Sequence, residues 1–260
     1  MSTTISMRSM SCSTSPRGIA AVIGVGPKLG RSVASKFAHE GYTVAILARD
    51  LGTHPDPPIH RSILAPLSTF RINYNSVFAI RIDCSDSKSV REAFEVVLSL
   101  GFLEVLVFNA CEPPVSSPPI SFTAVTAQSF ERSLSVSAVG AFHCAQHVIP
   151  GMVERRRGTI IFTGSSASLI GFAGYCELSC GKFALRGLSQ CLAREFQSSG
   201  IHVTHVIIDG VIGSPRSSIG EQNTTLDPDA LAQTYWHIHT QKKGAWTQEI
   251  DLRASVDRPL

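Results

Sequence analysis

The sequence predicts an α/β protein built on a doubly wound parallel sheet that is flanked by helices. Short apolar runs alternate with longer helix-like stretches along the chain, as strands do when crossover helices join them. Two runs, 105–108 and 205–208, are largely apolar rather than alternating, which is typical of strands buried on both faces. Right-handed crossovers between such strands place a ligand at their carboxyl ends.

The elements follow one another in order from residue 19. We expect strands and helices in these ranges: strands at 19–23, 42–48, 77–82, 103–108, 158–163 and 201–208, and helices at 29–39, 87–98 and 129–152. Between the second and third strands, residues 50–76 carry four prolines that a helix interior does not accept, so an irregular Pro-rich loop is predicted there. Asp227 and Pro228 form an N-cap followed by proline, which predicts the start of a late helix.

Composition excludes several classes of protein. The 260 residues carry 23 Lys plus Arg against 20 Asp plus Glu, and the net charge of +3 is too small and scattered to predict nucleic-acid binding. No apolar run approaches the roughly 18 residues of a membrane span. The seven cysteines show no Cys-x-x-Cys spacing, which argues against a metal site and for a reducing compartment. We therefore expect a cytoplasmic protein without metal, nucleic acid or membrane partner.

The first residues differ from the rest in composition. Residues 1–18 contain no acidic residue, many Ser and Thr, and two arginines. This composition predicts a flexible N-terminal tail ahead of a single domain over 19–260. It also resembles a faint transit peptide, so a plastid or mitochondrial location stays open as the alternative.

A glycine-rich loop separates the first strand from its helix. It reads Gly24-Val25-Gly26-Pro27-Lys28-Leu29-Gly30. Glycines permit a tight turn at this place, and the amides at the helix N-terminus can face a pyrophosphate. A Rossmann-type dinucleotide site is therefore predicted, with Gly24, Gly26, Lys28, Leu29 and Gly30 as contacts. A glycine turn without ligand is the alternative.

The end of the second strand indicates which dinucleotide binds. Arg49 stands there, without the terminal carboxylate that accepts hydrogen bonds from the ribose hydroxyls of NAD. A guanidinium binds phosphate through two parallel hydrogen bonds, so Arg49 favours the 2′-phosphate of NADP, with Lys28 as a second positive charge. A solvated strand end beside Asp50 is the alternative.

These features occur in the order found in the short-chain dehydrogenase/reductase family, which the chain resembles over roughly residues 19–210. Gly24 and Gly30 match that family's Gly-x-x-x-Gly-x-Gly loop, with Lys28 in place of the middle glycine. The resemblance extends to the ends of the third and fourth strands. Asp83-Cys84 looks like the family's adenine-contacting pair, and Asn109-Ala110 like a shortened Asn-Asn-Ala-Gly turn.

The resemblance implies that these four residues, Asp83, Cys84, Asn109 and Ala110, contact NADP (NADPH). Capping of the local backbone is the alternative for Asp83 and Asn109.

The resemblance also implies a catalytic set for hydride transfer between nicotinamide and a carbonyl or alcohol. Ser165 stands where the family's substrate-orienting serine would be, and Lys182 matches the lysine that binds the nicotinamide ribose and lowers a phenol's pKa. The residue four positions before Lys182, however, is Leu178, which cannot transfer a proton. The resemblance therefore implies an atypical member that lacks tyrosine at this place.

Tyr175 is the candidate substitute, because positions 175, 178 and 182 share one helix face. Seven residues span about 10 Å along a helix, against about 6 Å for four, which weakens coupling to Lys182. Tyr175 is therefore either the proton donor or a packing aromatic.

The segment after the sixth strand departs from the family as well. Asp209 replaces the first residue of the usual Pro-Gly, and it either approaches the cofactor or caps the turn. Residues 211–245 are expected to form a mobile flap over the substrate pocket.

The sequence thus predicts an NADP-dependent oxidoreductase acting on a small carbonyl or alcohol. A catalytically impaired NADP-binding protein, acting as sensor or scaffold, is the alternative that Leu178 raises. By analogy with the family, the helices around 129–152 and 175–197 pair two copies, so a homodimer or homotetramer is expected.

Overall fold

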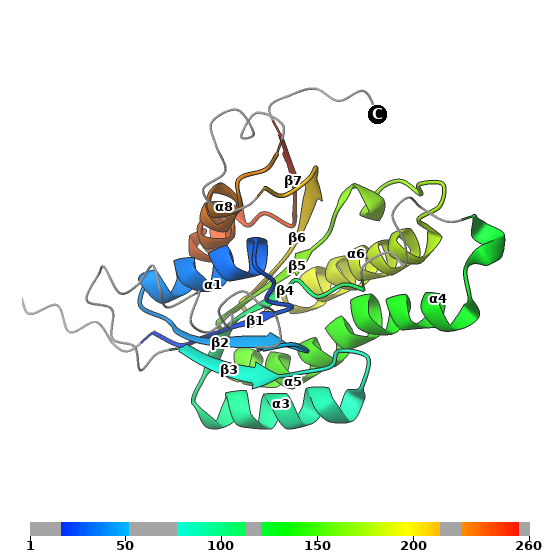
Figure 1. Cartoon of the computed structure of the whole chain (residues 1–260). Helices are drawn as coiled ribbons and strands as arrows, with labels where there is room; N and C mark the ends of the chain where they lie inside the picture. Colours follow the sequence, from blue (N-terminus) through cyan, green and yellow to red (C-terminus); the bar gives the residue numbers. More distant parts are fainter. Residues whose placement is uncertain (1–16, 52–76, 113–120, 214–224, 255–260) are drawn as a thin grey trace, which may run out of the picture.

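The computed structural model describes residues 17–51, 77–112, 121–213 and 225–254. Within these residues seven strands form one sheet in the order β3-β2-β1-β4-β5-β6-β7, and all neighbouring strands run parallel (Figure 1). The strand order reverses between β1 and β4, where a doubly wound sheet opens a crevice at its carboxyl edge. The predicted Rossmann-type α/β fold is confirmed.

The strands lie close to the predicted ranges. They are β1 Ile19–Ile23, β2 Thr43–Ala48, β3 Val77–Arg81, β4 Leu103–Phe108, β5 Gly158–Thr163, β6 Ile201–Asp209 and β7 Glu249–Arg253. The edge strand β7 was not predicted. Three of its five residues are charged, and acidic residues are depleted in strands, so its sequence gives a weak signal.

Helices cover both faces of the sheet. They are α1 Leu29–His39, α3 Ser87–Ser99, α4 Ala127–Leu134, α5 Gly140–Arg155, α6 Cys176–Phe196 and α8 Pro228–Thr240, with short turns η3 Phe122–Ala124, η5 Ser166–Ser168 and η6 Lys243–Ala245. The predicted helix 129–152 is two helices, α4 and α5, joined by the π-helical turn η4 Ser135–Val139.

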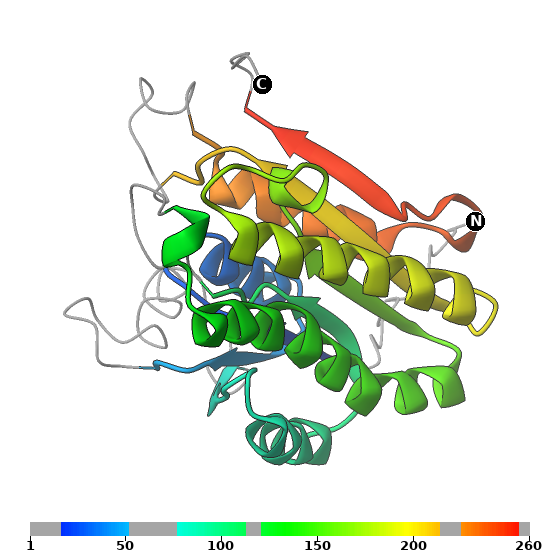
Figure 2. The ribbon, with the colours of Figure 1, turned by 90° about the vertical axis from the view of Figure 1, so that its right-hand side faces the viewer.

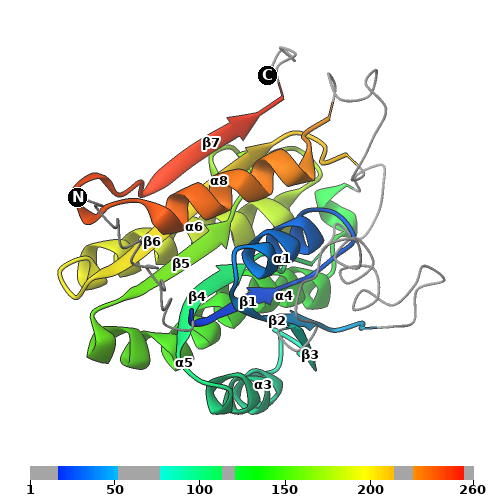
Figure 3. The same cartoon turned by 90° about the vertical axis from the view of Figure 1, so that its left-hand side faces the viewer.

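Each face of the sheet has its own apolar core. Helices α1 and α8 lie side by side on one face, and α3, α5 and α6 cover the other (Figures 2 and 3). On the first face, Val33 and Phe37 of α1 pack in the same cluster as Tyr235 and Ile238 of α8. Among the described residues, no helix combines the length and the hydropathy needed to cross a bilayer.

The late helix begins as the sequence indicates. Asp227 caps α8 by accepting a hydrogen bond from the backbone N–H of Asp229 at 2.9 Å, and Pro228 is the first helical residue. A flap was expected over 211–245, but α8 lies within this range and its residues pack in the core. The rest of the expected flap lies mostly before α8, and residues 214–224 of it are outside the described residues. The expected tail, apart from Arg17 and Gly18, and nearly all of the expected Pro-rich loop also lie outside them.

A half-buried histidine bonds α8 to the sheet and to the segment before β2. His239 Nε2 lies 2.6 Å from the Tyr42 hydroxyl, and its Nδ1 lies 2.9 Å from Thr159 Oγ1. Burial, with smaller contributions from nearby positive charge, lowers the pKa of His239 to about 4. The imidazole is therefore neutral at pH 7 and joins both hydroxyls as one donor and one acceptor.

Replacing this histidine should flatten the acid dependence of stability. Between pH 6.5 and 4 the unfolded chain binds a proton at His239 that the folded chain does not, so the free energy of unfolding falls on acidification, by up to about 3 kcal/mol. In urea titrations at pH 7, 6 and 5, His239→Gln should have a lower free energy of unfolding than wild type at pH 7. Its free energy of unfolding should also fall less steeply between pH 7 and 5. The exposed His39 gives the control, His39→Gln, and parallel pH curves for wild type and His239→Gln would contradict the expectation.

Candidate functional site

A cavity of about 790 Å³ opens at the carboxyl ends of β1, β2, β4, β5 and β6. This is the edge at which doubly wound sheets bind ligands, and the volume suits a small organic molecule. Nearly all the residues singled out in the sequence line it: Gly24, Gly26, Lys28, Leu29, Gly30, Arg49, Asp83, Cys84, Asn109, Ala110, Ser165 and Lys182. The structure thus brings the two predicted halves of the site together.

The glycine loop is shaped by close contacts with the backbone. Gly24 has φ +80°, and a Cβ there would lie 2.5 Å from the backbone of Ala110. A Cβ on Gly30 would lie 2.8 Å from Val25 Cα, whereas one on Gly26 would meet nothing within 4 Å. Gly24 and Gly30 therefore serve the turn itself, and Gly26 leaves open space at the cavity wall.

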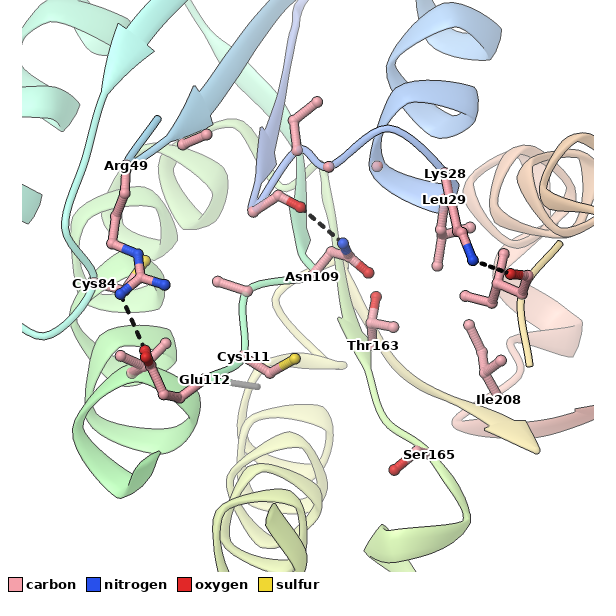
Figure 4. A pocket seen from close by; sticks show the side chains of 18 of the residues that line it. Lys28, Leu29, Arg49, Cys84, Asn109, Cys111, Glu112, Thr163, Ser165 and Ile208 are labelled. Atoms are coloured by element: carbon pink, nitrogen blue, oxygen red, sulfur yellow. Dashed lines mark hydrogen bonds and ion pairs between the residues drawn. The ribbon is translucent and has the colours of Figure 1, made fainter. Parts of the chain in front are cut away.

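Asn109 holds this loop in place from the neighbouring strand. Its Nδ2 donates a hydrogen bond to the carbonyl oxygen of Gly24 at 2.8 Å (Figure 4). The bond joins the ends of β1 and β4 rather than capping local backbone, and Asn109 also lines the cavity.

Lys28 reaches across the cavity. Its Nζ donates a hydrogen bond to the carbonyl oxygen of Ile212 at 2.7 Å, which joins the glycine loop to the segment after β6 (Figure 4). The ammonium thus adds positive charge beside the N-terminus of α1, where the helix dipole already favours an anion.

Four charged side chains gather where β2, β3 and β4 end. Arg49 Nη1 lies 3.1 Å from Glu112 Oε2, and Arg132 of α4 lies 3.5 Å from the same oxygen. Arg132 also approaches Asp83 at 3.8 Å. Burial alone would raise the pKa of Asp83, but hydrogen bonds from Ser85 and the two nearby arginines outweigh it and lower that pKa.

The other end of the cavity holds a buried lysine. Lys182 Nζ donates a hydrogen bond to the carbonyl oxygen of Thr163 at 2.7 Å, and the residue is only 4% exposed. Burial lowers the pKa of this ammonium, and the nearby Cys111 thiol opposes the shift. Leu178 lines the cavity one helical turn before Lys182. The Ser165 Oγ is buried; as the N-cap of η5 it accepts from the backbone N–H of Ser168, and its own O–H has no acceptor among the described residues.

The loop that carries Ser165 packs against the imidazole ring of His205. A side chain at Gly164 would collide with the ring of the buried His205. His205 Nδ1 lies 3.1 Å from Glu249, which also accepts two hydrogen bonds from Arg186. Burial lowers the pKa of His205 to about 4 although Glu249 opposes the shift, so this ring is neutral at pH 7.

Two predicted site residues lie elsewhere. Tyr175 immediately precedes α6 and is not among the described residues that line the cavity. Asp209 is also absent from that lining, and its carboxylate lies 3.2 Å from Arg253 on β7. These two residues are therefore not among those that form the cavity wall. Among the described residues, no group of three His, Cys, Asp or Glu side chains could hold a metal ion.

Several residues that line the cavity were not among the predicted site residues, and Cys111, Glu112 and Thr163 are three that carry polar or ionisable side chains. Cys111 and Glu112 directly follow Asn109-Ala110 at the end of a strand, and Thr163 is the last residue of β5. Their position after the carboxyl ends of strands, where ligands bind in such sheets, was the available signal.

Known proteins resemble this chain along most of its length. A short-chain dehydrogenase/reductase from Armillaria gallica is 33% identical over 253 residues, which cover 95% of this chain and 85% of that protein. The crystal structure of a short-chain dehydrogenase from Rhodopseudomonas palustris is 28% identical, covers 94% of this chain and all of that one, and has a TM-score of 0.76. A metagenomic short-chain oxidoreductase in complex with NADP is 21% identical, with a TM-score of 0.76 over 92% of this chain and 98% of that one.

The sequence model of short chain dehydrogenases matches residues 18–222 of this chain. That segment contains the glycine loop, Arg49, Ser165 and Lys182, which line one cavity. The chain therefore belongs to the short-chain dehydrogenase family and is an oxidoreductase of the class that acts on carbonyl and alcohol groups with a nicotinamide cofactor.

Proposed function

We propose that the protein is an NADP-dependent oxidoreductase that transfers hydride between nicotinamide and a small carbonyl or alcohol. The observation that carries the proposal is the shared cavity, which joins the glycine loop and Arg49 at one end to Ser165 and Lys182 at the other. A fold relative solved with NADP supports the choice of cofactor.

The residues present fit such a dinucleotide. The open space at Gly26 and the N-terminus of α1 accept the pyrophosphate, with Lys28 as a further donor. Arg49 binds the 2′-phosphate, and the remaining predicted contacts lie along the same wall: Leu29, Asp83, Cys84, Asn109 and Ala110. When bound, the cofactor supplies or accepts the hydride.

The chain's own groups act on the reacting oxygen and the ribose. Lys182 uses one N–H on Thr163 and keeps two for the ribose hydroxyls. The O–H of Ser165, which has no acceptor among the described residues, is available to donate to the substrate oxygen. Tyr175 is not among the residues that line the cavity, so we propose that an ordered water between Ser165 and Lys182 donates the proton to the substrate oxygen. Asp209 does not line the cavity either, and we propose no cofactor contact for it.

One observation favours a second candidate function. Leu178 faces the cavity at the place where the family resemblance implies the tyrosine acid, and an aliphatic side chain donates no proton. An NADP-binding sensor or scaffold without turnover accounts for this as well.

The assembly proposed here is a homodimer or homotetramer formed through α5 and α6. Large apolar side chains stand exposed near this pair of helices, among them Val139, Phe142 and Phe183 at 43% or more. Apolar side chains grouped on a surface are typical of a protein interface.

Cofactor binding should stabilise the fold. At a hundredfold excess over the Kd, NADPH contributes about 2.7 kcal/mol to the free energy of unfolding, which raises the Tm of a chain of this size by about 5 °C or more. Calorimetric titration with NADPH and NADH, paired with thermal unfolding, measures both quantities. No heat and no shift in Tm with either nucleotide would remove the proposal.

Restoring a phenol should raise turnover. Leu178→Tyr places a hydroxyl in the cavity one turn before Lys182, and a positioned acid contributes about 10²-fold or more to such reactions. We expect NADPH oxidation with a panel of small aldehydes and ketones to rise at least tenfold over wild type. Leu178→Phe adds the ring without the hydroxyl and is the matched control.

The two candidate functions differ in this experiment. Measurable turnover by the wild-type protein supports the oxidoreductase, whereas turnover only after Leu178→Tyr supports the sensor or scaffold. Equal rates for the Tyr and Phe variants would show that the missing phenol does not limit the reaction.

A further inference from the structure

The geometry points to Glu112 as the residue that sets the preference between NADPH and NADH, by occupying Arg49 in place of the 2′-phosphate. This inference rests on the proposed function, because it takes the dinucleotide to lie in the cavity with its adenosine ribose at the end of β2. Neither the family comparison nor the sequence pattern assigns a role to Glu112.

The contact joins two strand ends that are far apart in the sequence. Arg49 follows β2 and Glu112 lies four residues after β4, and the guanidinium Nη1 donates to Glu112 Oε2 at 3.1 Å (Figure 4). Both residues line the cavity, and the Glu112 side chain is only 21% exposed. The guanidinium that the 2′-phosphate would bind is therefore already paired with an internal anion.

A second arginine completes the arrangement. Arg132 Nε lies 3.5 Å from the same Glu112 oxygen, and Arg132 Nη2 lies 3.8 Å from Asp83 Oδ2. Two guanidinium groups thus face two carboxylates, so this group of four side chains has no net charge. Without Glu112, the same four positions would carry one net positive charge.

The two cofactors meet this arrangement differently. A phosphate monoester carries −1.5 to −2 charges at pH 7 and has to share Arg49 with Glu112, whose carboxylate both neutralises the guanidinium and repels the phosphate. NADH has no 2′-phosphate, so the Arg49–Glu112 pair can persist when it binds. Glu112 therefore weakens the binding of NADPH and leaves the binding of NADH nearly unchanged.

Removing the carboxylate tests this directly. Glu112→Gln keeps the shape of the side chain and removes its charge, and we expect calorimetry to show a Kd for NADPH at least tenfold lower, with the Kd for NADH within twofold of wild type. The fragments 2′,5′-ADP and 5′-ADP, which differ only in the 2′-phosphate, should repeat this contrast. Glu112→Ala should also lower the Kd for NADPH.

Matched variants separate this effect from a general change of charge. Glu92→Gln removes the same charge at an exposed position of α3 outside the cavity lining, where the carboxylate pairs with Lys88, and should leave both Kd values unchanged. Adding Arg49→Met to Glu112→Gln should abolish the gain for NADPH, because the two residues act on the same phosphate.

The outcomes are distinct. If wild type binds NADPH and Glu112→Gln leaves the ratio of the two Kd values unchanged, the inference is wrong and the proposed function stands. If Glu112→Gln raises the Kd for NADH fivefold and does not lower the Kd for NADPH, Glu112 accepts hydrogen bonds from the ribose hydroxyls. That result also overturns the inference. If wild type binds neither nucleotide, the proposed function fails together with the inference.

Discussion

The cavity depends on one close approach of backbone, between the glycine loop and the end of β4. Gly24 turns the chain at φ +80° with no space for a Cβ against Ala110, and Asn109 fastens the turn by its bond to the Gly24 carbonyl. Because β1 and β4 flank the point where strand order reverses, this contact lies at the crevice. It also fixes the turn that leads into α1, whose first residues line the cavity.

The fold could be predicted because strands that are buried on both faces of the sheet appear in the sequence as continuous apolar runs. Six strands and the N-cap at Asp227 follow from apolar runs and local capping chemistry, which involve near neighbours only. The edge strand β7 carries no such apolar run, because three of its five residues are exposed and none is buried. Its absence from the prediction also hid the partner of Asp209, because Arg253 lies on that strand.

The site was predictable to the extent that it consists of strand ends. Residues at the ends of β1 to β5 converge because parallel strands finish at one edge, whatever their side chains do. Pairings of side chains are different: Arg49 and Glu112 are 63 positions apart, and no local pattern states that they meet. Helix periodicity does not place Tyr175 relative to Lys182, because α6 begins only at Cys176 and Tyr175 is its N-cap residue with non-helical dihedrals.

The bond from Lys28 to Ile212 gives one ammonium group two uses. It links the first turn of α1 to the segment that follows β6, and in the proposed site the same group faces the pyrophosphate. The pyrophosphate and the Ile212 carbonyl would therefore share the three N–H groups of Lys28, which links the proposed nucleotide site to the segment after β6 through one side chain.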